Sequence, residues 1–354
     1  MAKGLRFPIV LDLGTHNLRL IQVKSADPGN IVLQKFVSND APRELVVSTF
    51  IENPIMDATP VENALKSLVK TAKLGYENVL VLIPDHGSLI NCLVAPPRYS
   101  RKEQEEAIRE DIAPVMPLPI ENWTIVHETV GRWEEDEITI ALATIKSNLL
   151  EIGGLVQRCG LNPQAVDINF FNVSNLIEHY LTDSANKDKS IALVHLGNET
   201  TTMGVFKNGA IRTVLNRPIG AYDFTKQISK HFHVPETEAE QFKRNEVFFL
   251  PESSPEQEGL YNFTVVKSVF SALAREIFTG MESYLTKFRE FTVQEVILSG
   301  GGGNFQNIQV LLAANLNCVV RPVGELFQVT TDNGPLDLAE RNALAPACGA
   351  LFRE

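Results

Sequence analysis

Residues that could bind a phosphate together lie in one short segment near the N-terminus, residues 8–24. An apolar run with a single charge, Asp12, is followed by the polar turn Gly14-Thr15-His16-Asn17, after which a second apolar run begins. The pattern predicts a β-hairpin whose turn presents backbone N–H groups, a hydroxyl and a carboxylate. Such a turn can bind a phosphate and hold a magnesium ion. Taken alone, however, the segment is better explained as an ordinary hairpin with a solvated aspartate.

The same pattern returns near the middle of the chain, in residues 190–211. An apolar run again ends in Leu-Gly, and the polar turn Asn198-Glu199-Thr200-Thr201 leads into a further apolar run. Gly14 and Gly197 correspond, and the offset between them (197 − 14 = 183) is about half of the 354 residues. A repeat of this length predicts two duplicated domains that face each other, because the units of a solenoid are far shorter.

A third segment, residues 296–305, combines a buried type of strand with a glycine-rich turn. The apolar run is followed by four glycines, Gly300 to Gly303, and then by a helix-like stretch that begins near Asn304. Glycines at such a turn let the backbone approach a flat or anionic ligand closely. Two hairpin turns followed by a strand–glycine turn, in this order, form a specific constellation.

This constellation resembles the ATPase superfamily of actin, Hsp70 and the sugar kinases. The first hairpin resembles the phosphate-1 loop of that superfamily, the second resembles the phosphate-2 loop, and residues 299–303 resemble its adenosine motif. The resemblance implies an α/β protein with an actin-like (ribonuclease H-like) fold of two domains. It also implies that ATP and Mg²⁺ bind between those domains.

The segments between these motifs supply the elements that must position them. Residues 57–75 predict a helix with Thr59 as N-cap, and residues 78–83 predict a buried strand. Residues 89–161 then follow a β-α-β-β-α pattern and predict a compact inserted subdomain. We therefore expect the first domain in 1–88 and 162–189, the insertion in 89–161, the second domain in 190–340, and a connecting helix in 341–354 that packs on the first domain.

Two runs around the insertion narrow the resemblance to one family. Residues 99–131 hold a glutamate-rich helix, a proline-bounded link and a strand, and residues 141–168 hold a strand, a helix and a Gly-Leu-x-Pro sequence. Both runs resemble PilM, the cytoplasmic actin-like family of type IV pilus assembly. The resemblance implies a groove between the first domain and the insertion that binds the N-terminal cytoplasmic tail of PilN, an inner-membrane pilus protein. Residues 89–95 and 138–144 are the candidate walls.

The resemblance also assigns the residues of the nucleotide site. Asp12 would hold Mg²⁺ through water, and Glu240 and Lys243 match a family segment that lies near the adenine and ribose. The remaining residues implied are, for the phosphates, Gly14, Thr15, His16, Asn17 and Arg19 in the first domain and Gly197, Asn198, Glu199, Thr200 and Thr201 in the second, and, for the adenosine, Gly300, Gly301, Gly302, Gly303 and Asn304.

Two departures from the superfamily pattern bear on hydrolysis. His195 stands where the phosphate-2 strand usually carries an aspartate, and Asn169 lies near the place of the side chain that positions the attacking water. A neutral histidine is a poor ligand for Mg²⁺, which prefers oxygen. Hydrolysis also needs a base or a water-positioning group beside the γ-phosphate. We therefore expect a nucleotide-binding assembly protein with slow or absent hydrolysis, in which Asn169 is the one candidate catalytic residue.

Composition excludes several other kinds of protein. The net charge of −11 argues against nucleic acid or an anionic membrane as the main partner. The four cysteines are widely separated, which argues against a disulfide framework or a zinc site and favours a reducing cytoplasm. No apolar window approaches the length of a membrane span. We expect a cytoplasmic protein that reaches the inner membrane through a partner and contacts other components of the pilus inner-membrane platform. Self-association stays open.

Three alternatives stay open at this stage. An FtsA-like division protein shares the architecture but ordinarily ends in a basic amphipathic membrane helix, whereas this chain stops at residues 352–354, directly after the predicted connecting helix. A small-molecule kinase would need a catalytic aspartate and a sugar pocket, for which the sequence offers no convincing candidate. A nucleotide-free scaffold of a pilus or type II secretion platform is favoured by His195 and opposed by the intact glycine turns.

Overall fold

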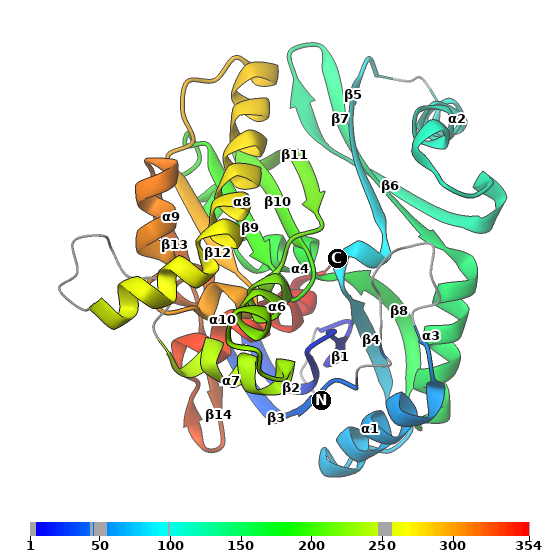
Figure 1. Cartoon of the computed structure of the whole chain (residues 1–354). Coiled ribbons are helices and arrows are strands. Elements are labelled where there is room, and N and C mark those ends of the chain that lie inside the picture. The colour runs from blue at the N-terminus through cyan, green and yellow to red at the C-terminus, as the bar shows by residue number, and fades with distance from the viewer. Residues whose placement is uncertain (1–4, 43–44, 46–54, 98–99, 247–256, 354) are drawn as a thin grey trace.

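The computed structural model describes residues 5–42, 45, 55–97, 100–246 and 257–353, and these form three β-sheets with helices between and around them (Figure 1). The largest sheet has seven strands. In spatial order they are β15 (Gly334–Pro335), β14 (Gln328–Thr331), β3 (Asn30–Asp40), β2 (Asn17–Asp27), β1 (Ile9–Leu13), β4 (Asn78–Ile83) and β8 (Asn162–Ile168). The first three strands of the chain form an antiparallel meander, and β1, β4 and β8 run parallel.

The second sheet repeats this plan with five strands. In order they are β11 (Ala210–Arg217), β10 (Thr201–Lys207), β9 (Ile191–Leu196), β12 (Glu295–Ser299) and β13 (Val319–Pro322), of which β9, β12 and β13 run parallel. The two leading hairpins have the same register. Asp12 pairs with Arg19 in the first and His195 with Thr202 in the second, and both pairs differ by the offset of 183 residues (195 − 12 and 202 − 19). The internal repeat is therefore a repeat of strand register.

The helices fall into three groups by the core that they bury. Side chains of α1 and α3 cover one face of the first sheet, α4 and α10 lie between the two sheets, and α6 to α9 cover the far face of the second sheet. In Figure 1 this gives α1 and α3 at the lower right, α10 in the centre, and α8 and α9 at the left. The bounds are α1 (Ala58–Thr71), α3 (Lys146–Arg158), α4 (Asn169–Leu176), α5 (Glu178–Thr182), α6 (Ala221–Phe232), α7 (Glu236–Asn245), α8 (Gln257–Phe288), α9 (Ile308–Leu316) and α10 (Leu338–Gly349).

Residues 89–145 build a small unit with its own core, at the upper right of Figure 1, whereas α3, the last helix of the predicted insertion, packs with α1 on the first sheet. Its three strands lie in the order β5 (Leu89–Ala95), β7 (Asp136–Ile145) and β6 (Trp123–Trp133), and its amphipathic helix is α2 (Arg101–Ile112). Ser100 and Glu103 form a capping box, since each side chain accepts a hydrogen bond from the backbone of the other. Trp123, Ile108 and Ile112 fill the space between helix and sheet.

Two predictions differ from the structure, one of a helix N-cap and one of a domain boundary. The N-cap of α1 is Asp57, whose Oδ1 accepts from the backbone N–H of Thr59 at 2.9 Å, so Thr59 lies inside the first turn. The second domain was predicted to extend to residue 340, but β14 and β15 belong to the first sheet, because β14 pairs in parallel with β3. That pairing joins segments about 300 residues apart in sequence, and no local pattern in the sequence encodes it.

Helices α4 and α10 make the closest helix contact between the sheets. A Cβ atom on Gly349 of α10 would lie 1.7 Å from the carbonyl oxygen of Asn172 in α4, so only glycine allows the backbones to approach this closely.

No helix in the described part of the chain is both long enough and apolar enough to cross a membrane.

We predict that Gly349→Ala lowers the free energy of unfolding by at least about 2 kcal/mol, because the methyl group forces α4 and α10 apart. Urea titration followed by circular dichroism measures this change. Gly153→Ala in α3 is the control: a Cβ atom there meets no described atom within 4 Å, so helix propensity should raise stability by about 0.5–1 kcal/mol. Equal stability of the Gly349→Ala variant and the wild type would refute the packing argument.

Candidate functional site

A cavity of about 450 Å³ lies between the two halves of the molecule. Five parallel strands, β1, β4, β8, β9 and β12, each contribute the residue that follows their last residue to its lining: Gly14, Pro84, Asn169, Gly197 and Gly300. Carboxyl ends of parallel strands are where open α/β sheets bind their ligands. The duplicated strand order therefore brings segments from the whole chain to one place.

Most of the site residues predicted from the sequence line this cavity. Thr201 and Gly303 do not, because the Thr201 hydroxyl donates to the carbonyl of Ile219 at 2.7 Å and Gly303 packs toward Leu298. The predicted residues that the structure brings together are Asp12, Gly14, Thr15, His16, Asn17, Arg19, Asn169, Gly197, Asn198, Glu199, Thr200, Glu240, Lys243, Gly300, Gly301, Gly302 and Asn304.

The first hairpin holds a buried acid beside a cation. Arg19 Nη1 lies 3.1 Å from Asp12 Oδ2, and Arg19 Nη2 donates to Asn17 Oδ1 at 3.3 Å. Burial raises the pKa of Asp12, and the guanidinium of Arg19 opposes that rise. The second oxygen, Asp12 Oδ1, is buried without a hydrogen-bond partner among the described residues. A carboxylate oxygen in this position fits a magnesium ion that keeps most of its waters.

Asp12 is the only residue for which we infer this role. Within the described residues, no three histidine, cysteine, aspartate or glutamate side chains lie close enough together to hold a metal ion. Any bound Mg²⁺ therefore depends on water and on ligand oxygens for most of its coordination.

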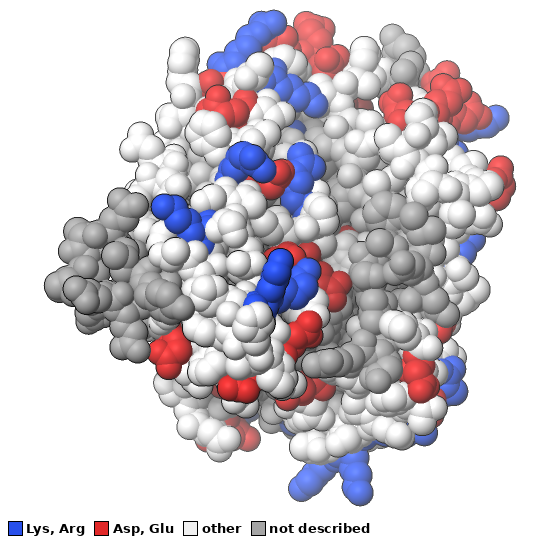
Figure 2. Space-filling model, viewed as in Figure 1, with Lys and Arg blue, Asp and Glu red and all other residues white. Residues whose placement is uncertain are grey.

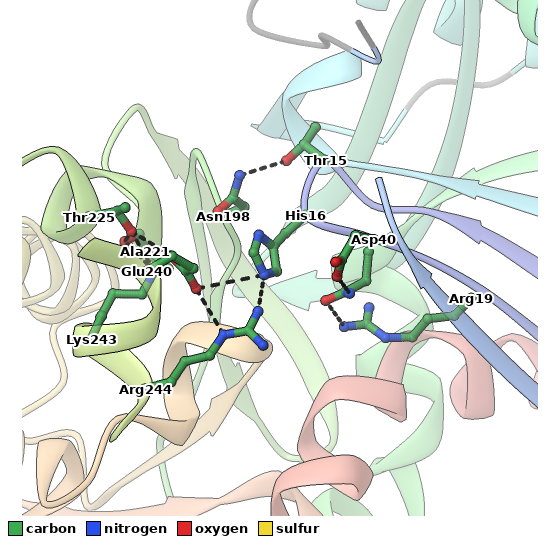
Figure 3. Close-up of polar contacts among 11 residues, drawn as sticks. Thr15, His16, Arg19, Asp40, Asn198, Ala221, Thr225, Glu240, Lys243 and Arg244 are labelled. Atoms are coloured by element: carbon green, nitrogen blue, oxygen red, sulfur yellow. Dashed lines mark hydrogen bonds and ion pairs between the residues drawn. The ribbon is translucent and has the colours of Figure 1, made fainter. Parts of the chain in front are cut away.

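The two halves of the molecule touch across the cavity, and Figure 3 shows two of the contacts. Asn198 Nδ2 donates to Thr15 Oγ1 at 3.2 Å, and these residues occupy equivalent positions in the two hairpin turns (198 − 15 = 183). His16 lies between Glu240 and Arg244 of α7, and the guanidinium of Arg244 donates to its Nε2. Burial lowers the pKa of His16, which favours the neutral ring that this contact requires.

Lys243 of α7 is buried at the cavity wall, between α6 and α7. Its ammonium group contacts Glu240, donates to Thr225 Oγ1 at 2.7 Å and lies 5.4 Å from the centre of the Phe305 ring. Burial lowers the pKa of Lys243, and the carboxylate of Glu240 opposes that shift. The ion pair of Lys243 and Glu240 therefore positions Ala221 and Phe305, which line the cavity. The carboxylate of Glu240 already neutralises the charge of Lys243.

The turn after β4, the 3₁₀ turn η1 (Asp85–Gly87), was not predicted as part of the site. Asp85 Oδ1 accepts from the backbone N–H of Phe170 at 2.8 Å, and His86 Nδ1 lies 3.3 Å from Thr200 Oγ1. Burial lowers the pKa of His86 to about 4, so its ring is neutral at pH 7. One signal was present in the sequence: two polar residues directly follow a buried strand, at the sheet edge where ligands bind. Arg244, Gln306 and Pro346 also line the cavity and were not predicted.

His195 and Asn169, the two departures from the superfamily pattern, both face the cavity. His195 Nδ1 lies 3.3 Å from Ser299 Oγ, and burial lowers the pKa of this histidine, which keeps it neutral. Asn169 begins α4, and its Oδ1 is buried without a hydrogen-bond partner among the described residues. The site thus presents a neutral imidazole and a free amide oxygen at these two positions.

The glycines of the third motif have different roles. Gly300 has φ +89°, and a Cβ atom on Gly302 would lie 2.4 Å from Leu196 Cγ, so these two glycines allow the 3₁₀ turn η4 (Gly301–Asn304) to pack on the second hairpin. A Cβ atom on Gly301 would meet no described atom within 4 Å. Gly301 is therefore the glycine of this turn whose open space faces the cavity.

The family model of the type IV pilus assembly protein PilM matches residues 10–353. The chain belongs to this family. The match covers nearly the whole chain and favours the PilM reading over the FtsA-like alternative.

Three solved structures show the fold. A PilM–PilN type IV pilus biogenesis complex is 20% identical, with a TM-score of 0.79 over 98% of this chain and 97% of that chain. The ethanolamine utilization protein EutJ from Carboxydothermus hydrogenoformans is 13% identical, with a TM-score of 0.53 over 98% and 90% of the two chains. MreB 5 of Spiroplasma citri, bound to AMPPNP, is 10% identical, with a TM-score of 0.50 over 94% and 93%. The predicted actin-like α/β fold is confirmed.

We predict that Glu199→Gln stabilises the protein at pH 8 and changes little at pH 5. Burial raises the pKa of Glu199 to about 7, above its ordinary value of 4.5, with Lys226 opposing the shift and Asp223 adding to it. The folded protein therefore holds this proton more tightly than the unfolded chain, and stability falls as the pH rises from about 4.5 to about 7.

Thermal unfolding at the two pH values tests this prediction. At pH 8 the Glu199→Gln variant should melt about 2 °C or more above the wild type. The exposed Glu282→Gln variant is the control and should follow the wild type at both pH values. A variant effect of the same size at pH 5 and pH 8 would contradict the assignment.

Proposed function

We propose that this chain, a type IV pilus assembly protein by family, binds Mg·ATP in the cavity between its two halves and binds the N-terminal cytoplasmic tail of a PilN-like inner-membrane protein. The observation that carries the nucleotide part is the pair of hairpin turns in identical register, which face each other across the cavity beside an unpartnered Asp12 oxygen. The observation that carries the partner part is the family match.

The charges around the cavity favour a triphosphate that binds together with magnesium. Four carboxyl groups line it (Asp12, Asp85, Glu199 and Glu240), against the three cations Arg19, Lys243 and Arg244. A bare triphosphate would therefore meet more negative than positive charge. Backbone N–H groups of the two turns and a divalent ion held by Asp12 supply the missing positive charge. We place the adenosine against Gly301 and Phe305, beside Glu240 and Lys243.

The same geometry supports slow or absent hydrolysis. Asn169 can orient a water through its free Oδ1, but an amide does not accept a proton from that water. His195 could act as a base only through Nε2. Its neutral ring also stands where the superfamily pattern has an aspartate, whose charged oxygen would be a better ligand for the metal. We therefore assign Asn169 a water-positioning role and propose that nucleotide binding, rather than turnover, serves the assembly function.

A second cavity, of about 710 Å³, fits the peptide. We call it the groove; it lies between the inserted sheet, the first domain and the β10–β11 turn of the second domain, with residues of β7, β8 and α4 in its lining. Six residues of β6 line it: Thr124, Val126, His127, Glu128, Thr129 and Val130. Among the described strands, β6 pairs with β7 alone, so its other backbone edge is open. An extended peptide can add to such an edge as a further strand.

Of the two candidate walls, β7 lines this cavity and β5 does not. Ile140, Leu142 and Thr144 of β7 line the groove, but no residue of β5 does. β5 instead packs on β11 of the second domain, where the Cys92 thiol donates to the carbonyl of Arg212 at 3.3 Å. β6 extends the wall formed by β7, its neighbour in the sheet, and β8, α4 and residues 206–211 of the second domain contribute to the rest of the lining.

We place the protein in the cytoplasm, at the inner membrane through its partner. The net charge of −11 is spread out: on the face shown in Figure 2, acidic and basic side chains are interspersed over the described residues. A mixed, acidic surface of this kind gives no support to direct binding of nucleic acid or anionic lipid.

We predict micromolar binding of Mg·ATP by calorimetry, and at least about tenfold weaker binding by the Gly301→Val and Asp12→Ala variants. The valine fills space beside the adenosine without an internal clash, and the alanine removes the magnesium-side oxygen. Gly75→Val, where a Cβ atom also meets no described atom within 4 Å, is the control. A folded wild-type protein that binds no nucleotide would instead be a nucleotide-free scaffold.

We predict that Val126→Asp weakens binding of a PilN-like N-terminal peptide about tenfold, because it places a charge in the groove beside Glu128. Fluorescence anisotropy of a labelled synthetic peptide measures the affinity. Val115→Asp is a closely matched control, because Val115 and Val126 are both 57% exposed and Val115 does not line the groove. Equal losses in the two variants would exclude this groove as the docking site.

A further inference from the structure

The nucleotide cavity and the groove share two short segments of the first domain. In residues 84–88, Pro84, Asp85 and His86 line the nucleotide cavity, and Ser88 lines the groove. In residues 167–171, Asn169 lines the nucleotide cavity, whereas Asp167, Ile168 and Phe171 line the groove. The two sites are therefore separated by only one or two residues along each segment.

The two segments are joined to each other by strand pairing and by one buried hydrogen bond. β4 and β8 are parallel neighbours, with Ile83 opposite Ile168 at their ends. Immediately beyond, Asp85 Oδ1 accepts from the backbone N–H of Phe170 at 2.8 Å, and Asp85 is 3% exposed. A carboxylate that accepts from a backbone N–H in a buried place makes a strong, directional link. The first turn of α4 is thus tied to η1.

Two side chains of residues 84–88 contact the two sites, one side chain for each site. His86 contacts the second hairpin turn across the nucleotide cavity, with Nδ1 3.3 Å from Thr200 Oγ1 and Nε2 3.4 Å from Glu199 Oε2. Ser88 Oγ lies 2.6 Å from Thr144 Oγ1 on β7, and both residues line the groove. A displacement of the second turn relative to the first domain therefore acts on His86 directly, and a displacement of η1 acts on β7.

We propose that residues 84–88, pinned to α4 by Asp85, are the element through which nucleotide and peptide binding act on each other. The identity of the two ligands rests on the function proposed above; the link between the two cavities is given by the contacts. A triphosphate held between the hairpin turns changes the position of Thr200 and Glu199 around His86, and the shift reaches the groove through Ser88 and through the start of α4. Coupling of this kind is reciprocal, so peptide must change nucleotide affinity by the same factor.

The test compares two substitutions at Asp85. Asp85→Ala removes the acceptor for the Phe170 N–H, whereas Asp85→Asn keeps an oxygen in that place. Peptide affinity is measured by anisotropy with and without Mg·ATP, at nucleotide concentrations that saturate each variant, so that a weaker nucleotide affinity does not imitate lost coupling. The wild type and Asp85→Asn should show at least a fivefold change in peptide affinity on adding Mg·ATP, and Asp85→Ala less than a twofold change. Asp188→Ala, at an exposed position outside both cavities, is the control.

A second measurement separates failure of this inference from failure of the proposed function. Hydrogen exchange of the backbone of β6 and β7 is followed on adding Mg·ATP alone, without peptide. Altered exchange in the wild type and not in Asp85→Ala supports the link even if the PilN-like peptide fails to bind. Two outcomes overturn it: a wild type that binds both ligands with no change in affinity or exchange, and an Asp85→Ala variant that is folded by circular dichroism and retains the full coupling.

Discussion

The identical register of the two leading hairpins is the constraint on which the site depends. In each hairpin four residues separate the last pair of the buried strands, Leu13 with Leu18 and Leu196 with Thr201. The equal turn length places Thr15 and Asn198 at equivalent points, where they bond to each other. A one-residue slip in either hairpin would turn Asp12 or His195 to the opposite face of its sheet. The geometry of the nucleotide cavity follows from this register.

Close packing between the sheets fixes how the two hairpins face each other. α4 and α10 fill the space between the sheets, and the approach at Gly349 leaves no room for a side chain there. α4 has a second role because its first residue, Asn169, lies in the nucleotide cavity while Phe171 and Ser174 line the groove. One short helix therefore belongs to the core and to both sites, which is why contacts at its N-terminus can link them.

The chemistry of the cavity favours holding a ligand over transforming it. Its cations Arg19 and Lys243 are already paired with Asp12 and Glu240, and burial keeps His86 and His195 neutral. We propose that the amide of Asn169 positions a water in this cavity, and an amide does not accept a proton from that water. A protein that uses nucleotide to set the shape of an assembly surface needs affinity and a change of shape, and it needs no fast chemical step.

The sequence by itself determined the local elements, namely the two hairpin turns and the glycine turn after β12. Each depends on turn chemistry or periodicity within a few residues, which a sequence displays directly. The tertiary structure alone decided that Asp85 and His86 join the cavity, that Arg19 points inward, that β6 rather than β5 lines the groove, and that β14 returns to the first sheet. Those outcomes depend on which distant strands pair, because side chains far apart in sequence meet only after the sheets have formed.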